Sequence, residues 1–192
     1  MLNELVLANR SYRSFDMSVP VPHDLLIAAV ENARLAPSSV NLQPLCYRLV
    51  EGEEACAALL PYTGWARNLP DHKLPPEGHA PTAYIVICQD LTIASNPTRF
   101  NRDVGIVAQT MMLTLVEAGF GGCMIGNFRP EAVAEHLGLD MERHLPQLIL
   151  ALGKPDEEIY LTELKPGEPS AYYRDEENRH FVPKRLTVDL II

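Results

Sequence analysis

The spacing of apolar residues changes several times along the chain, and each spacing predicts a different element. Residues 21–37 carry apolar side chains at helical intervals and end at Pro37, which predicts a helix. Apolar and polar residues alternate over 45–51, which predicts a strand, whereas the nearly continuous apolar runs 82–90 and 146–153 predict buried strands. The same reasoning predicts short helices near 2–8, 53–60 and 129–138, and a strand over 122–128.

The segment 101–120 predicts a helix that is apolar on nearly every side, with Val104, Met111 and Leu115 among its many apolar residues. Such a helix is buried all round, either in the core or against a partner chain. The stretch 180–192 also ends in apolar residues, and we expect another surface to cover it.

Helices and strands interleave along the chain without repeating as strict strand–helix–strand units. This order predicts an α+β fold, with a mostly antiparallel sheet flanked by helices. The length of 192 residues predicts a single domain spanning 1–192. Residues 61–81 hold five prolines, two glycines and Trp65, which predicts a long irregular loop that acts as a lid or binding loop.

The net charge of −9 argues against a nucleic-acid-binding protein, because phosphate backbones require a basic surface. An anion site must therefore be a local group of arginines and lysines. We expect a cytoplasmic protein that does not enter a membrane, because the sequence lacks both a signal-peptide pattern and an apolar run of spanning length. The four cysteines are widely spaced and mostly lie in apolar runs, which is typical of reduced, buried thiols.

The segment 9–15, Asn-Arg-Ser-Tyr-Arg-Ser-Phe, contains a candidate phosphate clamp. Arg10 and Arg13 can give charge-assisted hydrogen bonds, and Ser11 adds a shorter donor. The alternative interpretation is a solvated helix end. A second basic pair, Lys184–Arg185, could be an anion contact or ordinary surface charge.

The stretch 36–44 gathers Ser38, Ser39, Asn41 and Gln43 immediately before a predicted strand. A turn uses one or two such groups, so the remainder suit the polar edges of a flat heteroaromatic ligand. We expect Gln43 and Pro44 to shape the turn itself.

The glycine-rich stretch 118–128 is not a dinucleotide fingerprint. Gly119 and Gly121 fit the first two positions, but Met124 occupies the third, and the predicted order is helix to strand rather than strand to helix. Gly126 better suits a close approach of a ligand or another backbone.

Other chemistries lack their motifs. The six histidines show no zinc-binding spacing, and we expect no metal site. There is neither an acyl-transfer serine motif nor a P-loop, so catalysis would have to come from a bound cofactor.

In their order and spacing, these stretches resemble the FMN-dependent nitroreductase family over nearly the whole chain. The resemblance rests on Arg-Ser-x-Arg-x-Phe at 10–15, Ala-Pro-Ser-Ser-x-Asn-x-Gln-Pro at 36–44, the segment 103–128, the strand 148–155 and the C-terminal basic pair. Asn9 departs from the arginine that the family often has there.

The resemblance implies an intertwined homodimer that is joined through the helix 101–120 and binds FMN between its subunits. The FMN phosphate and ribityl chain would contact Arg10, Ser11, Arg13 and the pair Lys184–Arg185. The isoalloxazine ring would be lined from the other subunit by Pro37, Ser38, Ser39 and Asn41. The backbone N–H near Gly126 would point at flavin N5.

The resemblance also implies a ping-pong oxidoreductase, in which hydride passes from NAD(P)H to FMN and then to an oxidised acceptor such as a nitroaromatic compound or a quinone. Two alternatives stay open. One is a flavin-binding storage or sensor protein without turnover. The other is a flavin-free interaction module that uses Arg10, Arg13 and Arg185 on an acidic partner.

Overall fold

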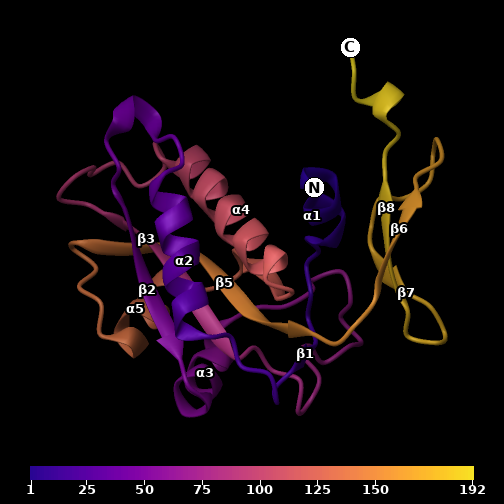
Figure 1. Ribbon diagram of the computed structural model, residues 1–192, viewed down its shortest axis with the longest axis horizontal. Helices are drawn as coiled ribbons and strands as arrows, with labels where there is room; N and C mark the ends of the chain where they lie inside the picture. Colours follow the sequence, from indigo (N-terminus) through magenta and orange to yellow (C-terminus); the bar gives the residue numbers. More distant parts are fainter.

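The computed structural model describes residues 1–192 and contains two sheets (Figure 1). All pairs in the larger sheet are antiparallel; its order is β1 (Phe15–Asp16), β5 (His144–Pro155), β3 (Ala83–Asp90) and β2 (Leu45–Glu51), and β4 (Gly121–Ile125) pairs with β5. The smaller sheet has the order β6 (Ile159–Glu163), β8 (His180–Lys184) and β7 (Tyr173–Arg174), with β6 parallel to β8. The predicted α+β class with a mostly antiparallel sheet is confirmed.

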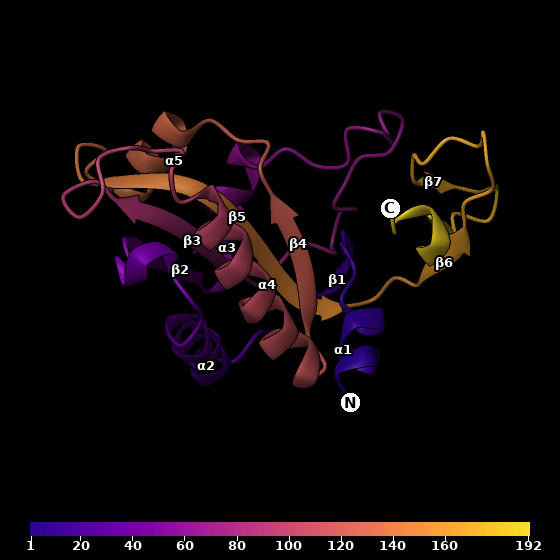
Figure 2. The same ribbon diagram turned by 90° about the horizontal axis from the view of Figure 1, so that it is seen from above.

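Helices cover both faces of the larger sheet. The helices are α1 (Leu2–Ala8), α2 (His23–Arg34), α3 (Glu53–Leu59), α4 (Asn101–Glu117) and α5 (Pro130–Leu137). Figure 2 shows α2 and α4 on one side of the sheet and α5 on the other. Helix α1 packs beside α4, close to the small sheet (Figure 1). No helix combines the length and the apolar character that crossing a membrane requires.

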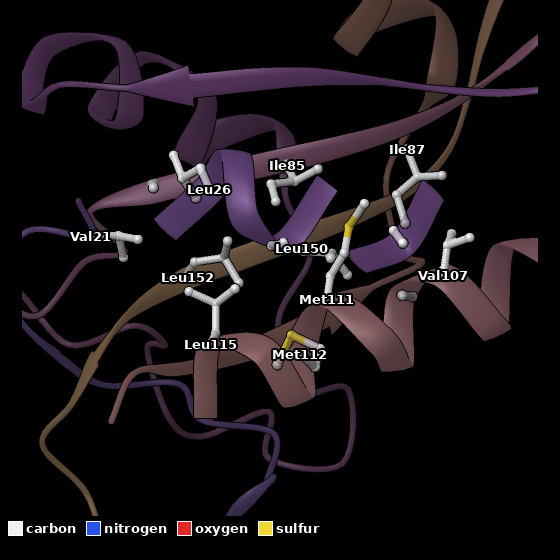
Figure 3. Close-up of a cluster of buried hydrophobic side chains, with 14 of the residues drawn as sticks. Val21, Leu26, Ile85, Ile87, Val107, Met111, Met112, Leu115, Leu150 and Leu152 are labelled. Carbon is white, nitrogen blue, oxygen red and sulfur yellow. The ribbon is translucent and has the colours of Figure 1, made fainter. Parts of the chain in front are cut away.

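The central strand β3 explains how two cores form. All eight of its residues are buried, and successive side chains point to opposite faces. Ile85 and Ile87 face α2 and α4, whereas Tyr84 and Val86 face α3 and α5. In Figure 3 the first core joins side chains from α2, β3, α4 and β5, among them Leu26, Ile85, Met111, Leu115, Leu150 and Leu152. Each such burial contributes about 1.5–3 kcal/mol, so these side chains fix α4 against the sheet.

Helix α4 differs from its sequence prediction in two ways. It ends at Glu117 rather than at 120, because Gly119 adopts a left-handed conformation with φ of 77°. Within the chain one face is open: Arg102, Gly105 and Gln109 are exposed, and Ile106 is 42% exposed. The interpretation that the core buries the helix on every side is therefore wrong for this face, while burial against a partner stays a prediction.

The remaining differences concern short elements and ends. Strand β4 stops at Ile125 rather than at 128, and the stretch after β8 forms a 3₁₀ turn, Thr187–Asp189, followed by exposed apolar residues. The sequence prediction omitted β1, β6, β7 and β8. Two of these are only two residues long, and apolar periodicity cannot identify an element of that length.

Candidate functional site

A pocket of about 380 Å³ lies between the small sheet, α4, β4 and the segment that joins α1 to β1. That segment runs beside the open edge of β4, where Ser11 forms a parallel bridge with Gly122 and the Tyr12 N–H donates to the Gly122 carbonyl at 3.0 Å. Arg10, Ser11 and Arg13 therefore reach one pocket. The other residues that line it include Gln109, Met112, Met124, Tyr172, His180 and Lys184.

Three cations line this pocket in an acidic protein. None of Arg10, Arg13 and Lys184 uses its side chain in an ion pair within the chain. Arg10 donates to the Val6 carbonyl at 2.5 Å, and Arg13 donates to the Ser11 carbonyl at 3.0 Å, yet the Nε atoms of both arginines are buried without a partner. Guanidinium donors that are left unsatisfied in a pocket wall fit an anionic group, phosphate above all.

Glu157 connects the segment before β1 with β7 and β8, and so it fixes the geometry of the pocket. It accepts from the backbone N–H of Arg13 and from Arg174 Nη2 at 2.5 Å, and the Arg174 and Glu157 side chains are only 7% and 8% exposed. His180 Nδ1 lies 3.7 Å from the same carboxylate. Burial alone would raise the pKa of Glu157, but the contact with His180, the Arg13 N–H and the Arg174 charge outweigh it and lower the pKa.

This lowered pKa predicts a stability change in acid. Because the folded-state pKa lies below the unfolded value of about 4.3, the ionised Glu157 stabilises the fold above that pH. The contribution is lost as the pH falls through the folded-state pKa. Urea unfolding from about pH 6 down to about pH 3 should show a component of stability loss in the native protein that Glu157→Gln lacks. Parallel pH profiles for the two proteins would contradict the assignment.

The loop 36–44 is anchored elsewhere, at the N-terminal end of α4. Asp103, which is 3% exposed, accepts from the Ser38 hydroxyl at 2.7 Å and from the Ser39 N–H at 2.9 Å. The Ser38 hydroxyl in turn accepts from the Gln43 N–H at 3.0 Å, so the loop hydrogen-bonds largely to itself and to α4. Pro37, Ser38 and Asp103 line a separate hollow of about 140 Å³. One chain therefore does not bring this loop to the cation-lined pocket.

Asp103→Ala should destabilise the protein by about 1–3 kcal/mol, because two donors lose a buried acceptor. Asp103→Asn is the matched control, since its amide oxygen can still accept, and it should lose clearly less. Urea unfolding at neutral pH measures both. Equal losses in the two variants would mean that the charge, rather than the acceptor, matters.

Gly126 follows the open edge of β4. Met124 lines the cation-lined pocket, whereas Gly126, which lies just beyond the end of β4, lines a different hollow together with Asn101 and Phe128. The N–H of Gly126 makes no hydrogen bond to the backbone, and the space where a Cβ would stand is open. The predicted lid 61–81 reaches this end of β4, because the Gly64 N–H donates to the Asn127 carbonyl at 2.8 Å.

Arg185 lies outside the pocket. Val182 and Lys184 line the pocket from one face of β8. Arg185 follows the end of β8, and its guanidinium donates to the Asp189 carbonyl.

The side chains give little support to nucleophilic catalysis or to a metal-binding site. All four cysteines are free thiols, and burial raises the pKa of Cys56 to about 11 and that of Cys88 to about 12, which makes them poor nucleophiles. No group of three or more His, Cys, Asp or Glu side chains is arranged to hold a metal ion.

The comparison with known families decides the relationship. The sequence pattern described as "Nitroreductase family" matches residues 6–154, which is well over half of the chain. The chain belongs to the nitroreductase family. The resemblance inferred from the motifs is thereby confirmed.

Individual members of the nitroreductase family are distant in sequence. The Bacillus subtilis protein named "Putative NAD(P)H nitroreductase YdgI" is 27% identical, and the match covers 89% of this chain and 96% of that protein. The crystal structure of a nitroreductase family protein from Streptococcus pneumoniae superimposes with a TM-score of 0.68 at 20% identity, covering 100% of this chain and 98% of that one. A "putative nitroreductase in complex with FMN" from Exiguobacterium sibiricum gives 0.67 at 22% identity, covering 82% and 89%. These structures show that the fold is shared.

In this nitroreductase-family chain, several residues of the pocket were absent from the sequence prediction. Glu157 and His180 carry no local motif. Glu157 accepts from the Arg13 N–H and lies 3.7 Å from His180, and these contacts join distant parts of the chain. One signal was available: the alternation of His180, Val182 and Lys184 along a strand puts all three on one face.

Proposed function

We propose that the protein is an FMN-dependent oxidoreductase that takes reducing equivalents from NAD(P)H and passes them to an oxidised organic acceptor, such as a nitroaromatic compound or a quinone. The observation that carries the proposal is the pair of buried, unpartnered Nε atoms of Arg10 and Arg13 beside Lys184. The names of the relatives, which include an NAD(P)H nitroreductase and a complex with FMN, support the choice of cofactor.

The phosphate end of FMN would contact Arg10, Ser11, Arg13 and Lys184. The pocket supports this assignment because its cations are unpaired and because Ser11 and Gly122 fix the segment against β4. Arg185 has its own contact at Asp189, so we leave it out of the phosphate site.

When bound, FMN supplies the redox chemistry, since a flavin ring accepts and returns a hydride. The chain contributes binding and orientation. The N–H of Gly126, which makes no backbone hydrogen bond, would be a donor for a polar edge of the ring, and Met124 offers an apolar surface in the wall of the pocket.

The proposal includes a homodimer. Three observations support it: the loop 37–41 lies apart from the pocket within one chain, the outer face of α4 is open around Ile106, and the tail exposes Leu190 and Ile191. In this arrangement Pro37, Ser38, Ser39 and Asn41 of a second copy would complete the wall of the site.

The visible spectrum of the purified protein, recorded after saturation with FMN and removal of free flavin, tests the proposal. A yellow protein that bleaches when anaerobic NADH or NADPH is added, and regains its colour with a quinone, is the expected result. A yellow protein that neither nucleotide bleaches would indicate the storage or sensor alternative. A colourless protein would overturn flavin binding altogether, and a monomer by light scattering would overturn the shared site.

A further inference from the structure

His180, the first residue of β8, is buried in the wall of the cation-lined pocket. It is 1% exposed, and neither of its ring nitrogens has a hydrogen-bond partner. Its ring meets Tyr172 edge-on, with centroids 5.7 Å apart. Buried imidazole nitrogens normally find partners, so an unpaired nitrogen in a pocket wall points to a ligand.

The two ring nitrogens of His180 have different surroundings. Nδ1 lies 3.7 Å from the Glu157 carboxylate, which favours a proton on that atom. Glu157 is itself paired with Arg174 on β7, so its charge is already partly balanced. Nε2 also has no hydrogen-bond partner within the chain, and His180 lines the pocket.

The charged groups around His180 have opposite effects on the protonation of its ring. Glu157, in the connection between β5 and β6, favours a second proton on the ring. A second proton is opposed by Arg174 on β7, by Arg13 and Arg10 in the segment before β1, and by Lys184 on the same strand. Tyr172 is the other titratable neighbour of the ring. A bound anion would neutralise the cations that line the pocket, which removes most of this opposition.

We propose that His180 is a further anion-binding residue of this pocket, which takes up a proton when a phosphate monoester binds and donates a hydrogen bond to it from Nε2. The inference rests on the proposed function, because FMN supplies the phosphate monoester. Under this proposal, flavin binding depends on pH through the contact between His180 and the phosphate, and not through the isoalloxazine ring.

The inference separates FMN from riboflavin, which has the same ring but no phosphate. Affinity for FMN should weaken as the pH rises from about 6.5 to about 8.5, because His180 then binds its second proton less readily. The second ionisation of the phosphate, at about pH 6, has the opposite effect on FMN affinity, and this effect is the same in every variant. Affinity for riboflavin should not follow the same trend.

The first experiment measures dissociation constants of FMN and riboflavin by fluorescence titration of the full-length protein. His180→Gln keeps a polar donor that cannot change its protonation state, and it should weaken FMN binding by about tenfold at the low end of the pH range and by less than about twofold at the high end. His136→Gln, on α5, is the matched control and should behave like the native protein. An identical pH slope in native protein and His180→Gln would overturn the inference while leaving the proposed function intact.

The second experiment needs no variant, so it stays decisive if His180→Gln folds poorly. Calorimetric titration near pH 7.5, in two buffers with different ionisation enthalpies, counts the protons taken up on binding; the phosphate is then almost fully ionised and contributes little. Net uptake with FMN and none with riboflavin is expected. Equal proton counts for the two flavins would overturn the role of His180. Failure to bind either flavin would overturn the proposed function itself.

Discussion

Replacing Glu157 by glutamine should lower the free energy of unfolding by about 3–5 kcal/mol, because it breaks a buried ion pair and leaves one charge behind. Glutamine has nearly the same shape and can still accept from the Arg13 N–H. It cannot balance the Arg174 guanidinium, which is 7% exposed. Urea unfolding at neutral pH, followed by Trp65 fluorescence and by circular dichroism, measures the loss.

Two further variants sharpen this result. Glu158→Gln changes the neighbouring exposed carboxylate, which contacts only the Tyr160 hydroxyl, and should alter stability by less than about 0.5 kcal/mol. Glu157→Gln combined with Arg174→Met removes the charge that would be left unpaired, so it should recover much of the loss. If Glu157→Gln alone costs less than about 1 kcal/mol, the pair is not the anchor described here.

The loss of stability in Glu157→Gln should also be confined to one part of the protein. Glu157 joins the segment before β1 to β7, and lies beside His180 of β8, so its carboxylate ties the small sheet to the main body. Limited proteolysis of Glu157→Gln should therefore cut within 158–184 before it cuts the large sheet, because regions that lose their buried contacts open first.

The sequence was sufficient for the elements whose apolar pattern is long enough to have a period. The strand 45–51 was predicted with the bounds that β2 has, and 82–90 differs from β3 by one residue. The burial of these strands comes from their own apolar side chains, so the local sequence was enough to predict them. The small sheet was missed because β7 spans two residues, and β6 pairs in parallel with a strand that begins 17 residues after β6 ends.

The site could be predicted only where its residues are close in sequence. Arg10, Ser11 and Arg13 form a compact motif, and the structure brings them to one pocket with Lys184. The contact between Ser38 and Asp103 joins residues 65 positions apart, so the sequence could not reveal that this hydroxyl already has an acceptor. Arg185 was grouped with Lys184 because the two are adjacent in sequence, whereas within one chain only Lys184 lines this pocket and Arg185 donates to the Asp189 carbonyl.

The different positions of Lys184 and Arg185 lead to the largest expected change in ligand binding. The double substitution Arg10→Ala with Lys184→Ala should weaken FMN binding by about 10²–10⁴-fold, since each charged hydrogen bond to a phosphate contributes about 1.5–3 kcal/mol and each 1.4 kcal/mol is about tenfold in affinity. Riboflavin has no phosphate, so its affinity should change by less than about threefold. Fluorescence titration with both flavins measures the two effects on the same protein.

Arg185→Ala is the matched control for this experiment. It removes an adjacent cation whose guanidinium donates to the Asp189 carbonyl rather than lining the pocket, so FMN affinity should stay within about twofold of the native value. A large loss in Arg185→Ala would mean that the basic pair acts as a unit and that β8 turns when ligand binds. A double variant that loses FMN and riboflavin equally would mean that Arg10 and Lys184 hold the pocket together, and that the phosphate binds elsewhere. Loss of FMN alone, with Arg185→Ala unaffected, would identify the face of β8 that carries Lys184 as the one that contacts the phosphate.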